Sequence, residues 1–254
     1  MLENAPVFIG VDPTAGREPF TYAALDEKCR LITLSSGEME SVLSFIVGFP
    51  AARVAINAPA RPNLGLVRKR LQDQNPQASS LRGADMRLAE YELRERSITV
   101  SPTSSQEEYC SAWTRMGFEL YRQLGKLGFR SYPSGDAPRQ FMETHPHAAF
   151  CVLLDQVPMP KPMLEGRLQR QLSLFTRQIG INDPMDFFEE ITRYKLINGI
   201  LPTELIYLPE ELDTIMAAYV AYLSLREPNQ VILLGDKEEG QIVLPTTGLK
   251  EEYS

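Results

Sequence analysis

The chain has 254 residues, of which 43% are hydrophobic and 23% are charged, as in ordinary globular proteins. Its net charge of −7 argues against a protein that coats nucleic acid through general basic charge, and it suits a site that gathers acids around cations. No apolar run approaches the roughly 20 residues of a membrane helix, and the N-terminus lacks a signal-peptide pattern. We therefore expect a cytoplasmic protein with no membrane partner.

The first part of the chain predicts a three-stranded meander. Residues 7–11, 20–26 and 29–35 are apolar or alternating segments separated by short polar breaks, which is typical of antiparallel strands. A helical pattern follows, and then a short apolar run at residues 52–59. The β-β-β-α-β order predicts an α/β fold: an antiparallel meander of three strands, then parallel strands, flanked by helices.

An insertion is expected next. Residues 61–83 are polar, rich in arginine and without sustained periodicity, which indicates a long loop with a partial helix. A charged helix is predicted at residues 84–97, and we assign about residues 61–110 to an insertion in a single domain covering residues 1–254. The basic residues here either form a solvated face or line a groove for a phosphate backbone.

The second half is mostly helical. A long helix with Ser104 or Ser105 as its cap is predicted, followed by a strand that ends at Glu143. Ala217, Ala218 and Ala221 allow close packing of the best-patterned helix. The remaining predicted elements are helices within residues 147–154, 163–180, 183–200 and 208–227, and a hairpin within residues 229–248.

Three acids stand where ligand groups gather in open α/β sheets. Asp12 and Glu143 each end a strand, and Asp213 lies near the start of an apolar helix. Converging carboxylates repel each other unless a proton or cation neutralises them, and Mg²⁺ or Mn²⁺ prefers such oxygen ligands. Ions held in this way can activate water for phosphodiester cleavage.

Each acid also has a purely structural interpretation. Asp12 followed by Pro13 fits the start of a type I turn. Glu143 can pair with an arginine, and Asp213 and Glu210 can simply favour the dipole at a helix start.

Eight blocks in chain order carry a resemblance to a known family. They are VFIGVDPTAG, VAINAPARPN, MRLAEYELRERSITVSPT, WTRMGFELYRQLGKLGF, METHPHAAF, LEGRLQRQLSLF, LDTIMAAYVAYL and EEGQIVLPT. Over about residues 7–245 the chain resembles the family of domain of unknown function 429, regarded as predicted nucleases of the ribonuclease H-like fold.

The resemblance implies a ribonuclease H-like domain with a metal-dependent nuclease site. Asp12, Glu143 and Asp213 would be the catalytic residues and the ligands of Mg²⁺ or Mn²⁺. Arg167 and Arg170 would bind phosphate. The supporting residues would be Asn57, Glu210 and His145. The implied partner is nucleic acid, DNA or RNA, as substrate; the oligomeric state stays open, with a homo-oligomer among the alternatives.

The chain departs from the family pattern at Asn57, where the family usually carries Asp. Asn offers a carbonyl oxygen but no charge, so the departure weakens the case for tight cation binding. Two other functions therefore stay open: a non-catalytic ribonuclease H-like binding module and an actin-like nucleotide-dependent phosphoryl transferase. A zinc site at His145 and His147 is disfavoured because their spacing across Pro146 matches no zinc motif.

Overall fold

The structure is a computed structural model that describes residues 5–14, 19–74 and 82–254. Gly16 of the expected turn after Asp12, and part of the expected insertion, lie outside these residues.

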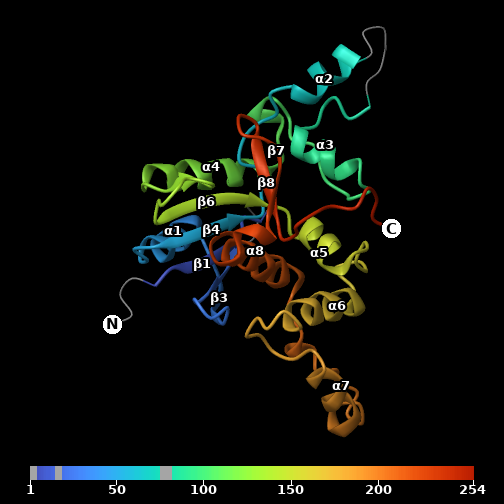
Figure 1. The fold of residues 1–254 in the computed structure, drawn as a ribbon. Helices are drawn as coiled ribbons and strands as arrows, with labels where there is room; N and C mark the ends of the chain where they lie inside the picture. The colour runs from blue at the N-terminus through green and yellow to red at the C-terminus, as the bar shows by residue number, and fades with distance from the viewer. Residues whose placement is uncertain (1–4, 15–18, 75–81) are drawn as a thin grey trace.

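All the strands of the described chain belong to one mixed sheet (Figure 1). Their order is β3-β2-β1-β4-β6-β8-β7, and β5 pairs with β6 beside this path. The meander β1, β2 and β3 is antiparallel, β1, β4, β6 and β8 run parallel, and β7 and β8 form the predicted hairpin. The strands are β1 Val7–Asp12, β2 Phe20–Leu25, β3 Leu31–Gly37, β4 Ala52–Ile56, β5 Arg130–Ser131, β6 Arg139–Thr144, β7 Ile232–Asp236 and β8 Gly240–Leu244.

Helices cover both faces of the sheet, which confirms a mixed α/β fold flanked by helices. On one face α8 contacts β1, β2 and β4, and α5 and α6 pack behind α8. On the other face α1 and α4 cover β1 and β4 with a second apolar cluster, while α3 contacts β7 and β8 (Figure 1). The helices are α1 Met39–Val47, α2 Leu66–Gln74, α3 Leu88–Arg94, α4 Ala112–Lys126, α5 Pro146–Leu154, α6 Leu164–Phe175, α7 Asp186–Glu190 and α8 Pro209–Arg226.

A glycine in β1 allows α8 to lie unusually close to the sheet. A Cβ atom added at Gly10 would stand 2.0 Å from the Thr214 carbonyl oxygen and 2.5 Å from the Ala218 nitrogen. The predicted close packing at the alanines of α8 is confirmed, because Ala217, Ala218 and Ala221 are all buried. Helix α8 is buried on several sides, and not on a single apolar face as its periodicity suggests, because it lies between the sheet and α5 and α6.

One local prediction is wrong, and one short strand was not predicted. Helix α4 begins at Ala112, and its cap is Ser111, whose Oγ accepts a hydrogen bond from the Thr114 amide at 3.1 Å. The expected cap at Ser104 or Ser105 fails because a separate 3-10 turn, Glu107–Tyr109, precedes the helix and Cys110 is extended. Strand β5 is too short to show a periodic signal, so the sequence gives no warning of it.

Two further observations concern the cysteines and the lengths of the helices. The three cysteines, Cys29, Cys110 and Cys151, are free and buried. Within the described ranges, no helix is both long enough and apolar enough to cross a membrane.

Candidate functional site

A cavity of about 390 Å³ opens where β1 ends and α8 begins. It collects side chains from six separate parts of the chain, at the edge of the sheet where the parallel strands β1, β4 and β6 finish. Its lining residues are Asp12, Thr14, Asn57, Trp113, His145, His147, Lys161, Glu210 and Asp213. The structure therefore brings Asp12 and Asp213 together with the three predicted supporting residues.

Asp12 is held in place by two hydrogen bonds, and its surroundings disfavour the ionised carboxylate. Its Oδ1 accepts from the Thr14 amide at 3.1 Å, and its Oδ2 accepts from the Asn57 side chain at 3.0 Å. Thr14 has a φ of 44°, a conformation that β-branched residues rarely adopt. Burial, and then the negative charge of Asp213, raise the pKa of Asp12 to about 6.

Asp213 has one paired and one unpaired oxygen. Its Oδ2 accepts from the Lys161 ammonium at 2.8 Å. Its Oδ1 is buried and has no hydrogen-bond partner among the described residues. Burial raises the pKa of Asp213, against the lowering effect of Lys161. Partial burial opposes the charge on Lys161, but the ion pair with Asp213 prevails and raises the pKa of the ammonium.

Two histidines line the same cavity and stay neutral near pH 7. Burial, and then the neighbouring His147, lower the pKa of His145 to about 3. Burial, and then the charge of Arg170, lower the pKa of His147 to about 4. The His145 Nδ1 accepts from the Ala148 amide at 3.1 Å and caps α5, so its proton must lie on Nε2.

Glu143 is not brought to this cavity, and the register of the sheet explains why. Glu143 pairs with Ile56, and Ile56 pairs with Val11, so these three side chains share one face of the sheet. Asp12 is one residue beyond Val11 and therefore points to the opposite face, toward α8.

On its own face, Glu143 is fully occupied in a buried ion pair. The Arg87 guanidinium donates to both of its carboxylate oxygens, and the Ala60 amide donates to Oε2 at 2.8 Å. Arg87 also pairs with Glu90 at 2.7 Å, and both side chains are buried. Glu143 thus attaches α3 and the loop after β4 to the sheet.

The two arginines expected to face phosphate serve the backbone instead. Arg167 donates to the carbonyls of Ile206 and Tyr207. Arg170 is buried and donates to the Met159 and Gly166 carbonyls at 2.7 and 2.9 Å. Neither lines the cavity, although the charge of Arg170 lowers the pKa of Asp213.

Sequence reasoning missed Lys161 and undervalued Trp113. Lys161 stands between Pro160 and Pro162 in a segment without helical or strand periodicity. The only available signal was that flanking prolines restrict the backbone and can hold a side chain in one direction. Trp113 reads as a core residue of α4, but it is only half-buried and lines the cavity from the first turn of that helix.

The cavity does not contain a ready-made metal cage. Across residues 5–14, 19–74 and 82–254, no group of three or more His, Cys, Asp or Glu side chains is arranged to hold a metal ion. The acids that do converge are the two aspartates, with Glu210 lining the same cavity one turn before Asp213.

Comparison with known proteins places the chain in a family without an assigned activity. The model of the family described as "Protein of unknown function (DUF429)" matches residues 10–238, so the chain belongs to this family. No curated protein matches the chain, and no solved structure matches it.

Proposed function

We propose that this member of the DUF429 family hydrolyses phosphodiester bonds of nucleic acid in the cavity that contains Asp12 and Asp213. The observation that carries the proposal is the convergence of two buried carboxylates, one of which has an oxygen without a hydrogen-bond donor in the part of the chain that the structure describes. Buried charges are normally paired or bound to metals. Such an arrangement is typical of a site that receives a cation.

Mg²⁺ or Mn²⁺ fits the donors that are present. Mg²⁺ is usually held by one or two carboxylates and completes its shell with water and substrate phosphate, so a cage of three protein acids is not required. Asp12 and Asp213 would hold the ion. When bound, it would supply activation of water and charge stabilisation at the phosphorus. Asn57 orients Asp12 and does not replace the missing charge.

The charges of Lys161 and Asp12 also suit a site that binds a phosphate and a cation. Lys161 lies against Asp213 and provides a fixed positive charge for a substrate phosphate. With a pKa of about 6 in the metal-free protein, Asp12 is mostly ionised near pH 7, which is the form that a divalent ion binds. This proposal assigns the phosphate contact to Lys161 and gives Glu143, Arg167 and Arg170 structural roles.

The topology supports the ribonuclease H-like part of the proposal. The β1-β2-β3-α1-β4 order is that of a ribonuclease H-like core, in which β2 runs against its neighbours. The Asp12 cavity lies at the carboxyl ends of β1 and β4, where such α/β sheets bind ligands.

A non-catalytic binding module is the second candidate. It is favoured by Lys161, because a protein ammonium already neutralises one of the two carboxylates. This candidate predicts that the cavity binds phosphate compounds equally well with and without divalent ions.

The test is cleavage of fluorescent DNA and RNA oligonucleotides with Mn²⁺ or Mg²⁺. We expect wild type to cleave and both Asp12→Asn and Asp213→Asn to lose activity. Asp136→Asn is the matched control, since it removes the same charge from an exposed position before β6, at the opposite edge of the sheet. Equal rates for wild type and Asp12→Asn, or no cleavage by any variant, would refute the hydrolase.

A further inference from the structure

A second cavity, of about 600 Å³, adjoins the site through Trp113. The indole is a lining group of both cavities. The walls of the second cavity come from residues 63–68 around the start of α2, from Ala84 and Asp85, from the segment 101–105, and from residues 109–114 at the start of α4. None of the predicted site residues lies in it.

Two aromatic side chains, Tyr109 and Trp113, line this cavity and are accessible to solvent. Tyr109 is 73% exposed although it is a large ring, and its ring contacts no other aromatic ring within the described chain. Trp113 is half-buried beside it. Exposed rings beside a cleft offer flat surfaces on which unstacked bases can lie, whatever their sequence.

Positive charge lies next to these rings. Arg68 lines the cavity, and Lys69 and Arg70 follow it on α2; all three are exposed. No ion pair of theirs is found among the described residues. Of these three cations Arg68 lines the cavity itself, and Asp85 is a carboxylate in the same lining. Phosphate groups are the natural counter-charge for such a set.

Hydroxyl groups complete the lining. Ser101, Ser104, Ser105, Ser111 and Thr114 all face this cavity. Serine and threonine hydroxyls are common donors to phosphate and sugar oxygens and carry no sequence information. The combination of rings, cations and hydroxyls therefore suits a nucleic-acid backbone with its bases exposed.

We infer that this cavity binds single-stranded nucleic acid, with bases against Tyr109 and Trp113 and phosphates toward Arg68, and that it leads the strand to the Asp12–Asp213 cavity. The inference rests on the proposed function and names its substrate class. Single strands are selected because the rings can be reached only by bases that are not stacked within a duplex.

Binding is measured separately from cleavage. Fluorescence anisotropy with labelled oligothymidine and oligouridine of about 12 nucleotides, in EDTA, uses the full chain and prevents hydrolysis by a divalent ion. We expect wild type to bind these single strands more tightly than a duplex of equal length. Tyr109→Ala should weaken binding by about 5-fold or more, since base stacking on an aromatic side chain contributes that much. Tyr109→Phe should restore it.

The contribution of Arg68 is measured from the salt dependence of binding. Arg68→Ala should reduce the slope of log K against log salt by about 0.7, between about 50 and about 200 mM salt. Arg130→Ala is the matched control, because Arg130 is also exposed but lies at the opposite end of the sheet. It should leave both affinity and slope unchanged.

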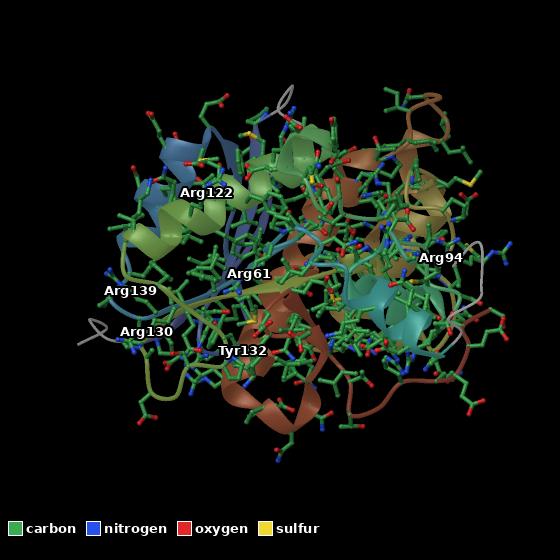
Figure 2. The ribbon with its side chains drawn as sticks, turned by 90° about the horizontal axis from the view of Figure 1, so that it is seen from above. Arg61, Arg94, Arg122, Arg130, Tyr132 and Arg139 are labelled. Carbon is green, nitrogen blue, oxygen red and sulfur yellow. The ribbon has the colours of Figure 1, made fainter. Side chains whose placement is uncertain are left out.

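The inference is overturned if Tyr109→Ala binds as tightly as wild type, if Arg130→Ala weakens binding as much as Arg68→Ala, or if the duplex binds as well as the single strand. Binding that follows the expected pattern without any cleavage would refute the hydrolase and keep the inference. Cleavage that is unaffected by Tyr109→Ala would do the reverse. Figure 2 shows that the control residue Arg130 lies on the opposite half of the molecule from Arg94 of α3.

Discussion

The charge on Asp12 should make the folded protein less stable as the pH rises. Burial and Asp213 raise the pKa of this carboxyl from 3.8 to about 6. A difference of that size between the folded and unfolded states corresponds to about 3 kcal/mol. Because the native state keeps this proton up to a higher pH, the contribution is fully present below about pH 4 and is lost as the pH rises through about 6.

Asp12→Asn should remove this pH dependence, because the amide is uncharged and nearly the same size. The free energy of unfolding of the variant, minus that of wild type, should increase by about 3 kcal/mol between about pH 4 and about pH 7. For a chain of this length, that corresponds to a rise of roughly 6–12 °C in the difference of Tm. The variant is thus expected to gain stability relative to wild type as the pH rises, and to be inactive.

The assay is urea unfolding followed by circular dichroism in EDTA, repeated across this pH range. Asp136→Asn, which changes an exposed carboxyl, should differ from wild type by the same small amount at every pH. If the difference for Asp12→Asn does not change with pH, Asp12 titrates in the native protein as it does in the unfolded chain. The argument that burial and Asp213 disfavour the charge on Asp12 would then be refuted.

Excess Mn²⁺ should stabilise wild type at neutral pH and leave Asp12→Asn unaffected.

Two further predictions concern the framework. Gly10→Ala should lower the free energy of unfolding by about 1–3 kcal/mol and displace α8, because the new Cβ would lie 2.0 Å from the Thr214 carbonyl oxygen. Thermal unfolding measures this loss. Gly125→Ala is the control, because the added Cβ meets no described atom within 4 Å and should leave stability unchanged or raise it. Glu143→Gln should cost about 1–3 kcal/mol, because the buried Arg87 guanidinium loses one of its two carboxylate partners and keeps Glu90. Chemical unfolding measures this loss, and an unchanged free energy of unfolding would contradict the buried ion pair.

Most of the strands could be predicted from the sequence because each carries a local signal, and β5 is the exception. The meander, the parallel strands after it and the final hairpin are each marked by apolar runs and polar breaks. The close approach of α8 was also foreseeable from its alanines. Gly10 is the partner feature on the sheet, and a single glycine inside a strand gives no such hint by itself.

The composition of the site was less accessible to sequence reasoning because it depends on register and on distant segments. Lys161 reaches Asp213 from a proline-flanked connection that shows no periodic pattern. The pairing of Glu143 with Arg87 joins residues that are far apart in the chain, and only the folded arrangement identifies the partner.

The separation of Asp12 from Glu143 shows which rule decides membership of this site. Both acids lie at the carboxyl end of a parallel strand, so position along the strand treats them alike. Their side chains nevertheless point to opposite faces, because Glu143 is in register with Val11 and not with Asp12. Helix α8 covers only the face of Asp12, and Gly10 allows it to approach closely enough to place Asp213 at the same cavity. A strand-end acid therefore joins the site only if it also faces α8.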